Sequence, residues 1–245
     1  MNRFFFIGFF LFFGLILTEA GYAVRSESCI KPLTSLPFPL SKTTKETIAP
    51  IFKPAPKITI MVDPGHGGKD KGTYSTKIPR YEEKQLTLTI SRFLKTYLEN
   101  IGYAVLLTRS SDIFIDKEKR AEIANNRNAT VFVSIHFNSA QNRQAEGVEI
   151  FYYRADASNM RSNRSKMLAD LVLKRMLLIS EAPSRGVKHG SLAVVRLTQM
   201  PAILVECGFL TNANEVKKLK DPGYLKKLAW GIAQGIQDYC QSSAL

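Results

Sequence analysis

Three side chains able to bind a metal or move a proton follow apolar runs of the chain. His66 comes after ITIMV and lies in the glycine-rich turn DPGHGGKDKG. His136 comes directly after TVFVSI, and Glu206 comes directly after AILV. Continuous apolar runs bounded by turn residues are typical of strands buried on both faces. Because the carboxyl ends of parallel strands meet at one edge of a sheet, we expect the three side chains to converge there.

Glu83 is the fourth candidate, and the helix after the first loop sets its direction. Apolar residues recur at helical spacing in YEEKQLTLTISRFLKTYLENIGY, among them Leu86 and Ile90, and Gly102 ends the pattern. Glu83 lies three residues before Leu86 and seven before Ile90, which places it on the same core-facing stripe of the helix. Glu82 is rotated off this stripe by about 100°. We therefore expect Glu83 to point inward and Glu82 to point to water.

Two histidines and a glutamate around an open fourth position form a recurring catalytic zinc set. The metal lowers the pKa of a bound water to about 7, which makes hydroxide available at neutral pH. A second glutamate that is not a ligand can take the proton of the water and pass it to the leaving amine. The alternative for each histidine is a hydrogen-bonding loop residue. However, two of only three histidines occupy the same structural position, which favours a metal hydrolase.

Other motifs carry less weight. GHGGKDKG resembles a phosphate-binding loop, but Asp70 stands where that motif requires a hydroxyl. Ser28-Cys29-Ile30-Lys31 fits the S-x-x-K pattern of penicillin-binding enzymes but has no K-T-G partner. The third histidine, His189, lies between Lys188 and Gly190 and is expected on the surface.

The elements that must position these residues alternate between strands and helices. This alternation predicts an α/β fold with a largely parallel sheet covered on both faces. We expect strands at 58–62, 103–108, 130–135, 147–153, 192–196 and 202–205, and helices at 81–101, 116–126, 162–179 and 224–240.

Five sequence blocks, in order, resemble the zinc-dependent N-acetylmuramoyl-L-alanine amidases of bacterial cell walls. The resemblance covers about residues 57–240 and rests on VDPGHGGKDKGT, EEKQLTLTI, VFVSIHFNSA, GVEIFYY and ILVECGFLTNANEV. It implies a mostly parallel, twisted six-stranded sheet with helices on both faces. The residues at matching family positions are the zinc ligands His66, Glu83 and His136, the catalytic Glu206, and the supporting residues Asn138 and Arg120.

The implied reaction is hydrolysis of the amide between N-acetylmuramic acid and the L-alanine of the peptidoglycan stem peptide. In this scheme zinc polarises the carbonyl and activates water, and Glu206 carries the proton. A zinc peptidase or deacetylase acting on the wall is one alternative. A non-catalytic wall-binding regulator on the same fold is another, although it would not need a general base.

The chain's ends and charge bear on its location and partners. A basic start and the apolar run FFFIGFFLFFGLIL are followed by small residues, which predicts a signal peptide over 1–23 and export to the periplasm or cell envelope. An uncleaved anchor is the alternative, and no membrane span is expected in the mature chain. A proline-rich tether follows over 24–56, then the catalytic domain over 57–245.

The net charge of +13 favours anionic partners. No nucleic-acid motif accompanies it, so we expect salt-dependent attraction to wall carboxylates.

The cysteines do not form a disulfide framework, and the chain shows no sign of an inhibitory insertion. Cys207 is expected in the core, whereas Cys29 and Cys240 could pair if the chain ends meet.

Some relatives in the family carry a plugging helix after the fourth strand, but here only RADASNMR precedes the next helix. Asp156 is its sole candidate for a fourth zinc ligand. We therefore expect an open site that needs no obligatory activator.

Overall fold

The structure is a computed structural model that describes residues 58–76, 79–156 and 158–242. Six strands form one sheet in the order β2-β1-β3-β6-β4-β5. They are β1 (Thr59–Pro64), β2 (Ala104–Leu107), β3 (Val131–Asn138), β4 (Val148–Tyr152), β5 (Ser184–His189) and β6 (Ala202–Phe209). The helices are α1 (Glu83–Ile101), α2 (Lys117–Asn126), α3 (Met160–Ser180), α4 (Ala193–Arg196), α5 (Ala213–Leu219) and α6 (Pro222–Gln241).

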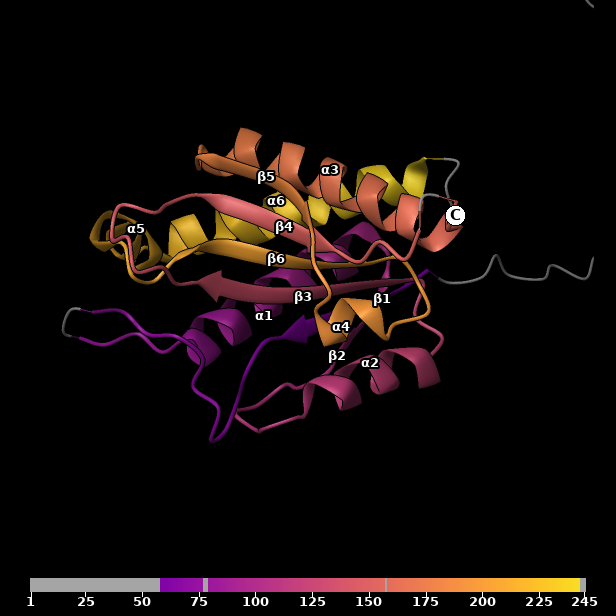
Figure 1. The fold of residues 1–245 in the computed structure, drawn as a ribbon, viewed down its shortest axis with the longest axis horizontal. Helices are drawn as coiled ribbons and strands as arrows, with labels where there is room; N and C mark the ends of the chain where they lie inside the picture. The colour runs from indigo at the N-terminus through magenta and orange to yellow at the C-terminus, as the bar shows by residue number, and fades with distance from the viewer. Residues whose placement is uncertain (1–57, 77–78, 157, 243–245) are drawn as a thin grey trace, which may run out of the picture. The chain divides into compact units, whose positions relative to one another are not determined.

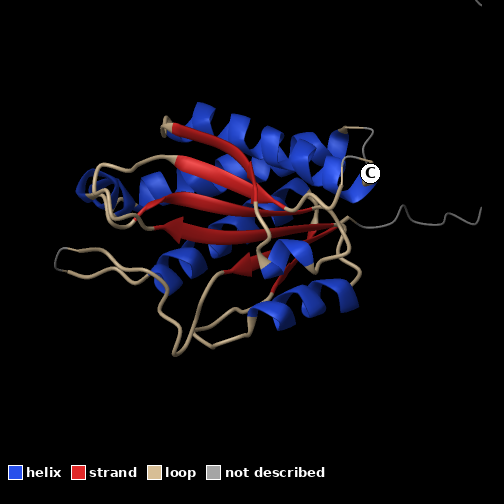
Figure 2. Cartoon of the chain, in the orientation of Figure 1, coloured by secondary structure: helices blue, strands red, loops and turns tan. Residues whose placement is uncertain are grey.

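The predicted α/β class is confirmed, and the sheet is mixed. β2, β1, β3 and β6 run parallel to one another, whereas β4 pairs antiparallel with β6 and parallel with β5. Figure 1 shows α1, α3 and α6 along one side of this sheet, with α2 and α4 on the other. Figure 2 shows the same arrangement, with loops joining the strand ends. One apolar cluster fills each face, so the sheet is covered on both sides as predicted.

Several elements differ from the sequence-based predictions, and the short helix α5 was not predicted at all. The predicted strand at 192–196 is wrong: this segment contains the short helix α4, whose valines pack into the apolar cluster around Met61 and Phe132. The fifth strand is instead β5, whose polar sequence SRGVKH lacks an apolar pattern because β5 is an edge strand. In addition, β3 and β6 continue through His136 and Glu206 rather than ending before them.

Several predictions concern residues that the structure does not describe. The proposed signal peptide, the tether and Cys29 all lie within residues 1–57. Cys207 is buried in the core as expected, and Cys240 is partly buried. Pairing of Cys29 with Cys240 therefore stays a prediction. Within the described part of the chain, no helix is both long and apolar enough to span a bilayer.

Helix α6 lies close against α3 because two glycines remove side chains from the contact. A Cβ atom built on Gly235 would come within 2.3 Å of Val172 Cα, and one on Gly231 within 2.7 Å of Met176 Cα. These neighbours are backbone atoms and cannot move aside without separating the helices. The glycines therefore set the spacing of the two helices that cover one face of the sheet.

We predict that Gly235→Val lowers the free energy of unfolding by about 2–3 kcal/mol, because the added atoms overpack the α3–α6 contact. Urea denaturation followed by circular dichroism measures this loss. Lys227→Val introduces the same residue at an exposed position of α6 and should change stability by at most about 0.5–0.7 kcal/mol. Equal effects of the two substitutions would contradict the proposed close packing.

Candidate active site

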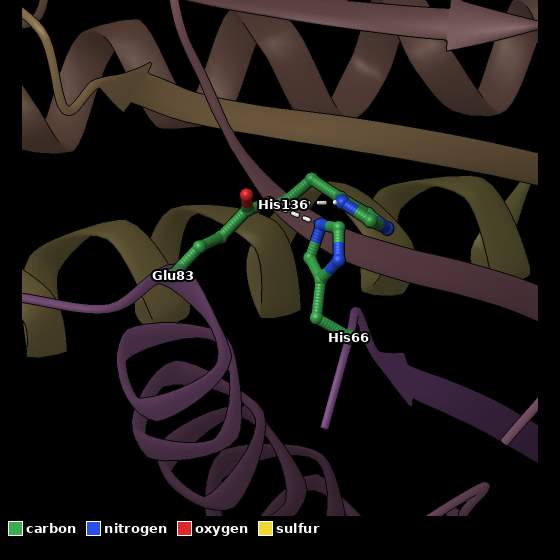
Figure 3. Close-up of side chains that lie close together, drawn as sticks. All are labelled: His66, Glu83 and His136. Atoms are coloured by element: carbon green, nitrogen blue, oxygen red, sulfur yellow. Dashed lines mark hydrogen bonds and ion pairs between the residues drawn. The ribbon is translucent and has the colours of Figure 1, made fainter. Parts of the chain in front are cut away.

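Three predicted ligand residues lie together at the edge of the sheet. One donor atom from each of His66, Glu83 and His136 lies within 4.8 Å of the other two. Glu83 Oε1 is 3.1 Å from His66 Nε2 and 3.0 Å from His136 Nδ1. Figure 3 shows the two imidazole rings and the carboxylate directed at one another from three separate elements. Among the described residues this is the one His/Cys/Asp/Glu group with the geometry of a metal site.

The carboxylate of Glu83 is buried and fully hydrogen-bonded. Burial alone raises its pKa, but hydrogen bonds from His136 and His66 outweigh this and lower the pKa to about 2. Its Oε1 also accepts from the backbone N–H of Phe137, and Oε2 accepts from that of Thr73. Glu83 therefore points inward as predicted. The neighbouring Glu82 is partly exposed and pairs with Lys71.

A second carboxylate fixes the orientation of His66. Asp70 Oδ2 lies 2.8 Å from His66 Nδ1, on the side of the ring opposite Glu83. Burial alone lowers the pKa of His66, but hydrogen bonds to Glu83 and Asp70 raise it overall. Carboxylate–histidine pairs of this kind commonly orient metal-ligating imidazoles. In the sequence Asp70 stood out only as a mismatch to a phosphate-binding loop, so this contact was not predicted.

The glycine-rich turn allows close approach of the ligands. His66 has φ of 60°, a left-handed conformation that is uncommon for residues other than glycine. A Cβ atom on Gly65 would lie 2.4 Å from the His136 ring, and one on Gly72 would lie 2.4 Å from Glu83 Oε2. Any side chain at these two positions would displace a predicted ligand. The turn therefore brings backbone against the site from two sides.

Two buried arginines hold this turn in place. Arg120 donates to the carbonyl oxygens of Pro64 and His66, at 2.6 and 2.7 Å. Arg109 donates to those of Pro64 and Gly65, at 2.9 and 2.7 Å. Arg120 was predicted as a supporting residue from the family resemblance, whereas Arg109 was not predicted. Its place just after β2, at the same sheet edge, was the available signal.

Asp63 supplies the negative charge between the two arginines. It is fully buried, and its carboxylate accepts from Arg120, Thr108 and Ser134. A buried charge is tolerated when it is paired and hydrogen-bonded in this way. The end of β1 is therefore tied to the strands on both sides of it.

Glu206 lies beside the three-residue cluster. It is in register with His136 across β3 and β6, so both side chains project from the same face of the sheet. Its Oε2 is buried and has no hydrogen-bond partner among the described residues. Burial raises the pKa of Glu206 to about 7, and the charges of Glu83 and Glu149 add to this effect. A carboxylate with these properties can accept and release a proton near neutral pH.

Glu149 continues the row of side chains on the other side of Glu206. It is in register with Glu206 across the antiparallel β4–β6 pair. Its buried carboxylate accepts from Asn138, from Lys188 and, at 3.1 Å, from Arg185. The predicted supporting residue Asn138 thus acts through Glu149. Sequence reasoning missed Glu149, Arg185 and Lys188, because nothing in the sequence showed that β4 runs antiparallel.

A cavity lies next to the two histidines of the candidate site. Its volume is about 500 Å³, and it lies among His66, His136, the segment 114–120 and the first residues of α4. The candidate site is therefore accessible to a ligand from the α2–α4 side.

The predicted surface residue His189 is exposed at the end of β5.

Comparison with known proteins assigns the chain to a family. The N-acetylmuramoyl-L-alanine amidase family matches residues 60–238. The chain belongs to this family. It is 34% identical over 181 residues to N-acetylmuramoyl-L-alanine amidase LytC of Bacillus subtilis, covering 74% of this chain and 35% of LytC.

Solved structures of the amidase family share the fold. An N-acetylmuramoyl-L-alanine amidase from Clostridium difficile 630 superposes with a TM-score of 0.72 at 39% identity, covering 76% of this chain and 98% of that one. The CwlD amidase from Clostridioides difficile, solved in complex with the GerS lipoprotein, superposes with a TM-score of 0.68 at 32% identity, covering 75% and 98%. LytC and a second curated relative are longer than this chain, and the matched region spans 35% of the length of each.

We predict that Asp70→Ala weakens zinc binding about 10–100-fold, because the imidazole of His66 loses the partner that orients it. Competition with a chromogenic chelator measures the affinity. His66→Ala and His136→Ala should lose the metal on purification, as determined by elemental analysis.

Asp156→Ala is the matched control for the loss of an aspartate. The carboxylate of Asp156 is exposed and bonded to Ser158, so this variant should bind zinc like the wild type. Unchanged affinity in Asp70→Ala, or a loss in Asp156→Ala, would contradict the ligand arrangement.

Proposed function

We propose that this protein is a zinc-dependent amidase that hydrolyses the bond between N-acetylmuramic acid and the L-alanine of the peptidoglycan stem peptide. The observation that carries the proposal is the buried oxygen of Glu206, which lies next to His136 of the three-residue cluster and has no hydrogen-bond partner in the part of the chain that the structure describes. A purely structural glutamate in this position would be expected to have a hydrogen-bond partner. Membership of the amidase family supports the same reaction.

The residues present fit a zinc ion. Two imidazole nitrogens and one carboxylate oxygen are a common donor set for catalytic zinc. The glycine-rich turn brings these three donor groups close together. Asp70 is hydrogen-bonded to Nδ1 of His66, the ring nitrogen that does not face Glu83. Zinc bound there would supply a Lewis acid and would lower the pKa of water to about 7. We assign His66, Glu83 and His136 as its ligands.

The protein's own part in the reaction is proton transfer and positioning. Glu206 takes a proton from the attacking water, whose oxygen adds to the lactyl carbonyl carbon of the muramic acid. The same residue then gives that proton to the alanine nitrogen as the carbon–nitrogen bond breaks. The products are the carboxylate of the muramic acid and a stem peptide with a free amino terminus. A pKa near 7 suits a group that must act first as base and then as acid.

We predict that zinc-loaded wild-type protein releases stem peptides with an amino-terminal L-alanine from purified peptidoglycan, and that a chelator stops the release. Glu206→Ala should retain close to one zinc per chain and lose at least about 100-fold in rate, because the general base is missing. Mass spectrometry identifies the products, and elemental analysis counts the metal.

Glu122→Gln, an exposed change on α2, is the control and should leave the rate unchanged. Near-normal cleavage by Glu206→Ala would refute its catalytic role. Products cut at another bond would indicate the peptidase or deacetylase alternative, and no products would indicate a non-catalytic wall-binding protein.

Export to the cell envelope is part of the proposal, because the substrate lies outside the cytoplasm. The support is the sequence pattern of residues 1–23, with a signal peptide or an anchor as the two forms. The catalytic domain is proposed to begin at residue 57, close to the start of the family match at residue 60.

We further propose that the site is open without an activator. β4 ends at Tyr152 and α3 begins at Met160, which leaves a connection of ordinary loop length. Asp156, the sole candidate ligand predicted in this connection, is exposed and bonded locally to Ser158. The cavity beside His66 and His136 supports direct access for a substrate.

The purified protein, loaded with zinc and assayed alone, is predicted to cleave peptidoglycan at a readily measured rate, because no described segment closes the site. Product release followed over time by chromatography provides the measurement. The CwlD relative, solved with a lipoprotein, shows why a partner must be tested. Inactivity that is relieved only by adding a second envelope protein would overturn this proposal.

A further inference from the structure

The strands beyond Glu206 carry an excess of positive charge on the same face as the candidate active site. Arg185 and Lys188 both lie on the edge strand β5 and both contact the single carboxylate of Glu149. One cation is enough to neutralise one carboxylate, and Asn138 already donates to the other oxygen of Glu149. The cluster therefore has a net charge of +1.

Both cations keep donors that face solvent. Their side chains are 36% and 40% exposed, whereas Glu149 is buried. A guanidinium has five N–H donors and an ammonium has three, of which Glu149 uses one on each. Arg185 lies over the ring of Phe209 at 4.9 Å, and Lys188 lies over Phe151 at 5.9 Å. The two charged groups therefore lie over aromatic rings, which stabilise a cation without neutralising it.

This part of the sheet is open to a ligand. In Figure 1, α2 and α4 lie toward the β1–β3 end of the sheet, and no helix of the described chain is drawn in front of β4 and β5. The cavity on the other side of His136 has the opposite charge balance, with three carboxylates against two Lys and Arg side chains in its lining. An anionic group is therefore favoured over β5.

The spacing matches the proposed substrate. Neighbouring strands lie about 4.8 Å apart, so β5 is about 10 Å from β6, and the side chains of Arg185 and Lys188 reach back toward β4. An extended peptide advances about 3.5 Å per residue. A carboxylate on the residue after alanine lies about 7 Å from the scissile amide, so a peptide that runs from Glu206 toward β5 would carry it toward the two cations that contact Glu149.

We propose that Arg185 and Lys188 form a subsite for the α-carboxylate of the second stem-peptide residue, so that the peptide lies across β4 and β5 and the sugar lies on the cavity side. This inference rests on the proposed amidase function and adds substrate selectivity to it. The protein discriminates a free α-carboxylate from a carboxamide at that residue.

The test uses two synthetic N-acetylmuramoyl tripeptides of L-alanine, D-glutamate and L-lysine, linked through the γ-carboxyl of the glutamate. They differ only in whether its α-carboxyl is free or amidated. Zinc-loaded wild-type protein should cleave the free form with a kcat/KM about 10-fold higher. Lys188→Gln and Arg185→Gln each keep a hydrogen bond to Glu149 and remove a charge. Each should lower kcat/KM for the free form about 3–10-fold, mainly through KM, and change it for the amidated form by less than about twofold.

Lys166→Gln is the matched control. Lys166 is an exposed lysine of α3 that pairs with Asp170, and its loss should affect neither substrate. Equal cleavage of the two tripeptides by the wild type would overturn the subsite. So would an equal loss on both substrates in the Lys188 and Arg185 variants, because that result would assign the cations to support of Glu149 alone.

A binding measurement separates this inference from the proposed function. Calorimetric titration of both tripeptides into zinc-loaded Glu206→Ala protein should show about 10-fold tighter binding of the free form, and adding Lys188→Gln should remove most of the difference. Discrimination in binding without cleavage by the wild type would support the subsite and refute the amidase reaction. Equal binding, or none, would refute the subsite.

Discussion

Arg109 and Arg120 donate hydrogen bonds to the carbonyl oxygens of three consecutive residues, Pro64, Gly65 and His66. Both guanidinium groups are buried, and Asp63 balances part of their charge. Removing one partner of such a network would leave an uncompensated buried charge, which is far more costly than losing a surface pair. The left-handed backbone at His66 is thus held by hydrogen bonds from two buried side chains that lie outside the metal-binding cluster. The position of His66 relative to Glu83 and His136 depends on this constraint.

The fold followed from the sequence wherever strands and helices bury apolar side chains. β1, β3 and β6 are continuous apolar runs, and α1 and α6 have clear helical stripes, so both patterns were visible. The edge strand β5 was missed because it pairs on one side only and is largely polar. The segment 192–196 was mistaken for a strand because one turn of apolar helix is too short to show a period. Neither error could be corrected from local sequence, because sheet position decides both.

The candidate site was predictable where it depends on strand ends and helix faces. Parallel strands bring His66, His136 and Glu206 to one edge, and the helical period distinguishes Glu83 from Glu82. The supporting contacts were less visible. Asp70 and Arg109 act through local turn geometry, and Glu149 reaches the site because β4 reverses direction. A strand direction is a property of the whole sheet, and the local sequence of β4 does not determine it.

The reversal of β4 has a chemical consequence. It places Glu149 in register with Glu206, and like charges directly opposite one another across strands are destabilising. The cations of β5 and the amide of Asn138 neutralise Glu149 alone. Glu206 keeps an oxygen with no partner among the described residues, and its burial raises its pKa to about 7. The parallel half of the sheet therefore assembles the metal-binding residues. The antiparallel half keeps the neighbouring base free to exchange a proton, and its surplus charge faces the solvent from which a substrate arrives.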